Sequence, residues 1–225
     1  MAGKKYNSLK KEVPAQAVSI TDAVEWLKKN VQSKFDQTVE VTVRLGVDVG
    51  KSDQMVRSFV TLPGGSPKQK KLIVFTEDTT KQEAAKAAGA TIVGGKELID
   101  SISKDGSIDA DMAIATPDMM PKIAKVARIL GPKGLMPNPK TGTVTADPVP
   151  TIKELLAGKM SFKMDTLGNI HEPVAKLSWE TDRIVKNVEA MLEAVVQARP
   201  NTVKGQFLKG MYLKSTMSPA ITLAR

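Results

Sequence analysis

Residues 56–75, VRSFVTLPGGSPKQKKLIVF, contain the change of pattern that decides the fold. Residues 56–62 predict a strand, which ends at Pro63-Gly64-Gly65-Ser66-Pro67, the clearest linker signal in the chain. Residues 72–75 then form a short, wholly apolar run, which is typical of a strand buried on both faces. We therefore place a domain boundary in this linker.

The segment after the linker alternates short strands with helices. We expect strands at residues 72–75, 91–93 and 112–115, and helices at residues 80–88, 96–103, 119–130 and, after a loop rich in glycine and proline, 149–157. Thr80 is a suitable N-cap for the first helix, and Gly89 is a suitable C′ residue. This alternation predicts βαβ units and a small parallel sheet that helices cover on both faces.

The two outer segments share another pattern, with half-buried strands and long helices. Before the linker, Thr21 is a suitable N-cap for a helix through residue 31, and residues 38–44 alternate strictly between polar and apolar side chains. After Gly158, we expect strands at residues 160–164, 170–179 and 207–216, a turn at 166–169 and a helix at 181–198. Such strands are typical of antiparallel sheets with one face in the core.

These patterns predict an α/β fold with two domains. A discontinuous α+β domain holds residues 1–65 and 158–225, and a parallel βαβ (Rossmann-like) domain, residues 66–157, is inserted into it. The chain crosses between the domains twice, and we expect a hinge at Pro63, Gly64, Gly65 and Gly158. The alternative is one continuous domain with a glycine-rich turn.

Composition argues against an enzyme and against a resident metal. The chain has no cysteine, and His171 is its single histidine, which is a poor basis for a zinc site or a catalytic triad. The nearest approach to a phosphate loop is Gly94-Gly95-Lys96, but Glu97 follows where Ser or Thr would hold magnesium. We expect no cofactor. With no signal peptide and no apolar run of membrane-spanning length, we expect a cytoplasmic protein.

The charge balance favours a polyanionic partner. The net charge is +9 and the sequence pI about 9.6. The two outer segments hold 20 Lys and Arg against 13 Asp and Glu, a balance of +7, whereas the insert has 13 against 11, or +2. Aromatic residues make up only 4%, which favours a folded RNA over a single strand stacked on aromatic rings. The alternative is charge scattered over a solvated surface.

Three segments carry candidate RNA contacts. Residues 128–143 predict a stiff, exposed loop with Arg128, Lys133 and Lys140, unless Leu135 and Met136 pack it on its own domain. Lys34 and Phe35 precede a strand, where Phe35 could stack on a base or instead plug the core. The third segment offers hydroxyls and a pliable thioether, unless it is an ordinary strand end; it is Ser215-Thr216-Met217-Ser218-Pro219.

A set of specific motifs occurs in order along the chain. The most specific run is Gly131-Pro132-Lys133-Gly134-Leu135-Met136-Pro137-Asn138-Pro139-Lys140. Further matches are Phe35-Asp36, Val39-Glu40-Val41, Arg44-Leu45-Gly46-Val47-Asp48, Ser52-Asp53-Gln54-Met55-Val56-Arg57, Ala87-Ala88-Gly89-Ala90, Val93-Gly94-Gly95, Ala115-Thr116-Pro117-Asp118-Met119-Met120, Gly168-Asn169-Ile170-His171 and Ser215-Thr216-Met217. Together these motifs closely resemble the bacterial-type L1 stalk protein family of the large ribosomal subunit, and the resemblance covers nearly the whole chain.

The resemblance implies a structural protein of the ribosome with the two-domain architecture. It implies binding to a folded stalk region of large-subunit rRNA, contact with deacylated tRNA that leaves the exit site, and repression of its own mRNA. The RNA-binding residues are then expected to be Lys34, Phe35, Thr38, Lys163, His171, Ser215, Thr216, Met217 and Ser218. We expect no membrane partner and a monomer when the protein is free. A plastid source fits the resemblance as well as a bacterial one.

The chain departs from the family at two positions. Ser218 stands where the family usually has Gly, so its Cβ could crowd the RNA or strain a positive φ, or its hydroxyl could gain a contact. We therefore expect Ser218→Gly to keep or improve RNA affinity. Trp179 replaces a usual Phe, which we expect to change packing only.

Two other functions compete with a ribosomal role. The βαβ insert could belong to an enzyme that acts on a nucleotide, in which case ATP, GTP or NAD would stabilise the protein against heat. The protein could also act only on mRNA, away from the ribosome. Co-sedimentation with large subunits separates that regulator from a ribosomal protein.

Overall fold

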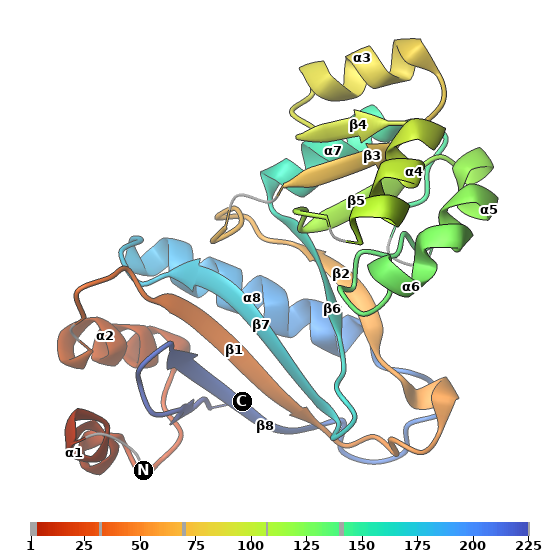
Figure 1. Cartoon of the computed structure of the whole chain (residues 1–225). Helices are drawn as coiled ribbons and strands as arrows, with labels where there is room; N and C mark the ends of the chain where they lie inside the picture. Colours follow the sequence, from red (N-terminus) through yellow and green to blue (C-terminus); the bar gives the residue numbers. More distant parts are fainter. Residues whose placement is uncertain (1–3, 32, 69–70, 107, 140–141, 225) are drawn as a thin grey trace. The chain divides into compact units, whose positions relative to one another are not determined.

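The computed structural model describes residues 4–31, 33–68, 71–106, 108–139 and 142–224 (Figure 1). The chain divides into two compact units, one formed by Met1–Pro67 and Gly158–Arg225 and the other by Lys68–Ala157. The first unit is α+β and discontinuous, and the second is a parallel βαβ insert. The fold class predicted from the sequence is confirmed.

The centre of the first unit is a four-stranded antiparallel sheet with the order β7-β1-β8-β9. Its strands are β7 (Asn169–Lys176), β1 (Thr38–Leu45), β8 (Leu208–Ser215) and β9 (Ile221–Thr222). The valines of β1 and Leu45 are buried, whereas the intervening side chains lie on the other face, so the expected alternation is confirmed. That second face is therefore free to carry polar chemistry.

Helices cover the apolar face of this sheet (Figure 1). α2 (Ile20–Asn30) and α8 (Thr181–Gln197) pack together there, and α8 buries Ile184, Val188, Met191 and Val195, which recur at helical spacing. α1 (Lys4–Glu12) precedes them. The expected N-cap Thr21 is wrong, because the Ser19 side chain accepts the Asp22 N–H at 3.1 Å and starts α2 two residues earlier.

A separate two-stranded antiparallel sheet leads to the insert. It pairs β2 (Arg57–Thr61) with β6 (Lys159–Lys163), and β2 packs against α8. The pairing continues to the boundary of the unit, because Leu62 N–H donates to Gly158 O at 3.2 Å. A Cβ on Gly158 would lie 2.9 Å from Gly65 Cα, and its φ is +120°, so only glycine fits here.

The segment around Gly64 is held tightly by α8. The Asn187 side chain is fully buried; its Oδ1 accepts Gly64 N–H at 2.7 Å, and its Nδ2 donates to Val174 O at 2.7 Å and to Gly65 O at 3.2 Å. Arg183 Nε donates to Gly64 O at 2.7 Å while its guanidinium stacks 3.7 Å from the Trp179 ring centroid. The expected hinge residue Gly64 is therefore clamped inside the first unit.

The second unit has a parallel sheet with the order β4-β3-β5, formed by β4 (Ile92–Gly94), β3 (Leu72–Phe75) and β5 (Met112–Ala115). β3 is buried at every position because its side chains enter two cores. α3 (Thr79–Ala87) and α7 (Pro148–Ala157) belong to one core, and α4 (Lys96–Asp105), α5 (Met120–Ile123) and α6 (Ala127–Leu130) to the other. The apolar run after the linker is thus explained.

Two details of the second unit differ from expectation. In place of the single helix expected at residues 119–130 the chain forms α5 and α6, with 3-10 turns at Pro117–Met119 and Ala124–Val126. Pro121 lies in the first turn of α5, where its missing N–H is tolerated, so it does not account for the break. The N-cap of α3 is Asp78 instead of Thr80. Gly89, with φ of +105°, follows α3 as expected at C′.

Asn187→Ala should destabilise the first unit by about 2–4 kcal/mol, because it leaves several buried backbone groups without partners. Trp26 and Trp179 both belong to the first unit, so tryptophan fluorescence during urea unfolding of the full chain reports this unit. Gln197→Ala, at an exposed position of the same helix, should change the unfolding free energy by less than about 0.5 kcal/mol. Equal effects from both substitutions would contradict the role given to Asn187.

Candidate nucleic-acid interface

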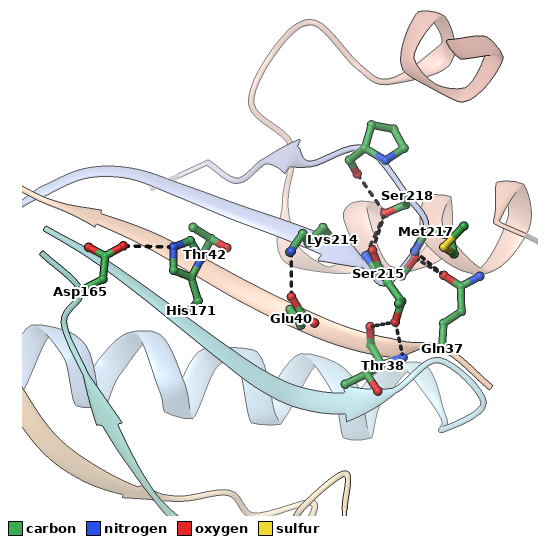
Figure 2. A network of polar contacts seen from close by, with 12 residues as sticks. Gln37, Thr38, Glu40, Thr42, Asp165, His171, Lys214, Ser215, Met217 and Ser218 are labelled. Carbon is green, nitrogen blue, oxygen red and sulfur yellow. Dashed lines mark hydrogen bonds and ion pairs between the residues drawn. The ribbon is translucent and has the colours of Figure 1, made fainter. Parts of the chain in front are cut away.

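The structure brings together two predicted segments that are far apart in sequence, the start of β1 and the end of β8 (Figure 2). Thr216 Oγ1 accepts Thr38 N–H at 3.2 Å, which continues the strand pairing beyond Ser215. Lys176 Nζ donates to Thr38 Oγ1 at 2.9 Å from β7 on the other side. Both hydroxyls therefore have fixed positions at one end of the sheet.

Gln37 joins the two segments from below this surface, and sequence reasoning missed it. Its side chain is only 1% exposed, and its Oε1 accepts Ser215 Oγ–H at 2.9 Å and Met217 N–H at 3.0 Å. A signal for it exists in the sequence, because Gln37 has the same parity as the buried Val39 and Val41. A polar side chain at an inward position of a strand needs partners, and the turn after β8 supplies them.

Ser218 fastens the same turn from its other side. Its Oγ accepts Ser215 N–H at 2.8 Å and donates to Pro219 O at 2.9 Å, and the residue is buried. The alternative of a strained backbone at Ser218 is wrong, since its φ is not positive. The hydroxyl therefore gains its contact within the protein, where it accepts the buried Ser215 N–H.

Two apolar side chains stand out on this ordered base. Phe35 is 54% exposed and Met217 is 60% exposed, so Phe35 does not plug the core. The segment before β1 is held by Asp36, whose carboxylate accepts the Ser178 N–H at 3.1 Å and its Oγ–H at 2.9 Å. Exposed Lys34 adjoins Phe35. We call the surface of Phe35, Thr38, Thr216 and Met217 the strand-end patch.

A row of polar side chains continues from the patch along the outer face of the sheet (Figure 2). Lys214 and Glu40 form an ion pair of 2.8 Å across β8 and β1. Farther along, Thr42 Oγ1 lies 3.1 Å from His171 Nδ1, and His171 Nε2 lies 3.6 Å from Asp165. Predicted residue His171 thus shares the face with the patch but lies in a separate group.

Asp165 organises the turn before β7. The N–H groups of Asn169 and Leu167 donate to its carboxylate at 2.7 and 2.9 Å. These bonds, chiefly that from Asn169, lower the pKa of Asp165 from its usual value of 3.8, and the nearby His171 adds to the effect. The turn therefore presents His171 from a frame that requires an ionised Asp165.

The other predicted residues belong to other elements of the chain. Lys163 is exposed at the end of β6, where it pairs with Arg57 of β2 in the other sheet of the first unit. Arg128 and Lys133 are exposed in the second unit, and Lys133 Nζ donates to Ile108 O at 3.1 Å. Leu135 is buried there while Met136 stays partly exposed, so half of the expected packing is observed. Lys140 lies outside the described residues.

The described part of the chain holds no group of three His, Asp or Glu side chains that could bind a metal ion. Among the helices within it, none is long and apolar enough to cross a bilayer. Asp109 and Asp111, at the edge of the second unit, form ion pairs with Lys71 and Lys68. These carboxylates therefore act as strand-edge partners of lysines.

Comparisons with known proteins agree with the motifs. Residues 27–219 match the ribosomal protein L1p/L10e family. The chain is 47% identical to the large ribosomal subunit protein uL1 of Persephonella marina, over 98% of this chain and 93% of that protein. It is 45% identical to the protein of the same name in Fervidobacterium nodosum, over 98% and 94%. The corresponding protein of Chlorobium phaeobacteroides is 44% identical, over 100% and 98%.

Ser218→Ala should lower the free energy of unfolding by about 1–3 kcal/mol, because Ser215 N–H stays buried without an acceptor. Ser218→Gly removes the same hydroxyl and should lose at least as much, so its expected benefit to RNA affinity comes with a less stable turn. Urea unfolding followed by tryptophan fluorescence measures both. The exposed Ser161 supplies the control Ser161→Ala. An equal loss of unfolding free energy in the control would show that the hydrogen bonds of Ser218 do not stabilise the turn.

Asp165→Ala should destabilise the first unit at pH 7, and the difference from wild type should shrink in acid. A carboxylate with a lowered folded pKa contributes stability above its usual value of 3.8, and loses it as pH falls through the folded pKa. Urea unfolding at pH 7 and at successively lower pH measures the difference. A difference that stays constant over this range would show that ionised Asp165 does not hold the turn.

Proposed function

The chain belongs to the ribosomal protein L1p/L10e family, and on this premise we propose that its strand-end patch binds a folded stalk region of large-subunit rRNA. As a member of this family it is a structural constituent of the ribosome and not an enzyme. The finer proposal concerns which surface meets the RNA and how it recognises it. The relatives compared above are bacterial, which supports a place on cytoplasmic ribosomes and gives no support for a plastid source.

The observation that carries the proposal is the pair of buried hydrogen bonds that Gln37 accepts beneath the patch. Gln37 bonds both Ser215 and Met217, so the exposed Phe35 and Met217 flank a backbone that is ordered before any partner arrives. A preformed surface loses little conformational entropy on binding. The fixed hydroxyls of Thr38 and Thr216 suit ribose and phosphate oxygens, and the Phe35 ring suits a base face.

Charge supports the same surface. The first unit holds the larger positive balance, and Lys34, Lys176, Lys214 and His171 lie in the patch or on the sheet face beside it. Lysines position phosphates without reading sequence, so specificity has to come from shape and from the fixed groups of the patch. Lys163, on the second sheet of the unit, extends the contact beyond the patch.

Two further roles rest on the family alone. We propose that the protein helps to move and release deacylated tRNA from the exit site, with Arg128 and Lys133 of the second unit as RNA contacts. We also propose repression of its own mRNA, which requires that the mRNA offer the same folded shape to the patch. The competing role, a regulator that acts only away from the ribosome, uses the same surface and differs in co-sedimentation.

Motion between the units is also a proposal. Since Asn187 and Arg183 hold Gly64 and Asn187 also holds the Gly65 carbonyl, bending is expected after Gly65 on one strand and at Gly158 on the other. Gly65 and Gly158 both have a positive φ, which glycine adopts without the steric cost of a Cβ, and this supports a bend at these two crossings.

Binding of the purified protein to a folded stalk-rRNA fragment, over a salt series and against an unrelated hairpin, tests the function. We expect tight binding to the stalk alone, with a modest salt slope of roughly −0.7 to −0.9 per neutralised phosphate. Equal and steeply salt-dependent binding to both RNAs would reduce the interaction to general charge attraction and would remove the proposed function.

Phe35→Ala should weaken binding to the stalk fragment about five- to hundredfold, the range for a lost base–aromatic stack. Val196→Ala on α8 is the matched control, because Val196 is 50% exposed on a helix that covers the opposite face of the sheet. The control should bind as wild type does. Loss of binding in both variants, or in neither, would place the RNA elsewhere.

A further inference from the structure

The amide nitrogen of Gln37 is a buried donor without a partner. Its accessible surface is below 1 Å², and among the residues that the structure describes no acceptor lies within hydrogen-bonding distance of it. Buried amide groups in native proteins are almost always hydrogen-bonded. An exception inside a surface already argued to bind RNA therefore needs an explanation.

The orientation of the amide is determined by its neighbours. Met217 N–H can only donate, and it donates to Gln37 Oε1 at 3.0 Å; the Ser215 hydroxyl donates to the same oxygen at 2.9 Å. Rotating the amide by 180° would place its NH2 group against Met217 N–H, donor against donor. Exchange of the nitrogen and oxygen thus cannot satisfy the group, and Nε2 remains the unpaired atom.

The unpaired nitrogen is directed toward the Met217 side of the patch. In Figure 2 it is directed away from Ser215, to the side on which the Met217 side chain projects. Met217 is 60% exposed, and its unbranched thioether adapts easily to a new neighbour. A modest shift of that side chain on docking is the step that brings an RNA oxygen to Nε2.

From this geometry we infer that Gln37 Nε2 donates a hydrogen bond to a ribose 2′-hydroxyl of the bound RNA. The inference rests on the proposed function and adds a residue that selects RNA over DNA at the patch. A neutral acceptor is favoured over a phosphate because the exposed side chains of Phe35 and Met217 make the surface over the site apolar, and because the two lysines on the neighbouring strands are already engaged. Lys176 bonds Thr38, and Lys214 pairs with Glu40.

Gln37→Glu isolates this donor. The carboxylate keeps an oxygen for Met217 N–H and the Ser215 hydroxyl but places a second acceptor where Nε2 stood. A 2′-hydroxyl can answer by donating instead of accepting, so the variant should still bind the all-ribose RNA. The two proteins should then differ in which modified ribose they tolerate at one nucleotide.

The experiment measures affinities of wild type and Gln37→Glu for stalk-rRNA fragments that carry single 2′-deoxy or 2′-fluoro nucleotides. At one nucleotide we expect 2′-deoxy to weaken wild type by about tenfold or more, as an unmade bond to a buried donor does, with 2′-fluoro weakening it less. For Gln37→Glu we expect the opposite ranking, in which 2′-fluoro weakens binding more than 2′-deoxy does. The carboxylate would face the fluorine with no proton between the two acceptors. Ser215→Ala, which loosens the same tie but keeps Nε2, should preserve the wild-type order.

Other outcomes overturn the inference. If the relative effects of 2′-deoxy and 2′-fluoro are the same for wild type and Gln37→Glu at every nucleotide, a 2′-hydroxyl is not the partner of Nε2. A difference that follows single methylphosphonate substitutions instead would assign the donor to a phosphate. Failure of wild type to prefer the unmodified stalk fragment over the unrelated hairpin removes the proposed function itself, and that result is obtained before any modified RNA is used.

Discussion

The inside–outside alternation of β1 is the constraint on which the first unit depends. Burial of Val39, Val41 and Val43 against the helices forces the residues between them onto the opposite face. The same rule, continued one step beyond the strand, turns Gln37 inward beneath the patch. The core and the candidate interface thus depend on the same strand geometry. A shift of β1 by one residue would move the valines out of the core and Gln37 out of its buried position.

Features that depend on neighbouring residues could be predicted from the sequence, whereas features that depend on contacts between distant residues could not. The apolar run at Leu72–Phe75 and the alternation of β1 are local patterns with a single structural meaning, and both were predicted correctly. The break between α5 and α6 was not predicted, because the helical periodicity of the apolar residues continues through it. The N-cap of α2 was misplaced because Ser19 and Thr21 are equally suitable residue types, and only the packing decides between them.

Most residues of the candidate interface could be predicted from the sequence, but the hydrogen bonds that connect them could not. Thr216 and Met217 were singled out first by the hydroxyls and the thioether of their segment and then by resemblance, and the exposure of Phe35 was an open alternative. The hydrogen bonds from Gln37 to residues about 180 positions away depend on strand pairing that no local pattern reveals. The role of the Ser218 hydroxyl was likewise hidden, since it serves a backbone group of its own turn.

The close approach of Gly158 to Gly65 has a consequence for how such a chain can be assembled. A Cβ at position 158 would touch both Gly65 Cα and Leu62 O at 2.9 Å, so the points where the chain leaves the first unit and re-enters it are as near as the ends of a tight turn. Replacing the ninety residues Lys68–Ala157 by a few turn residues would turn β2 and β6 into an ordinary hairpin and leave every strand neighbour in the first unit unchanged. The second unit is therefore an inserted domain that could be gained or exchanged as a whole without changes to the core of the first unit.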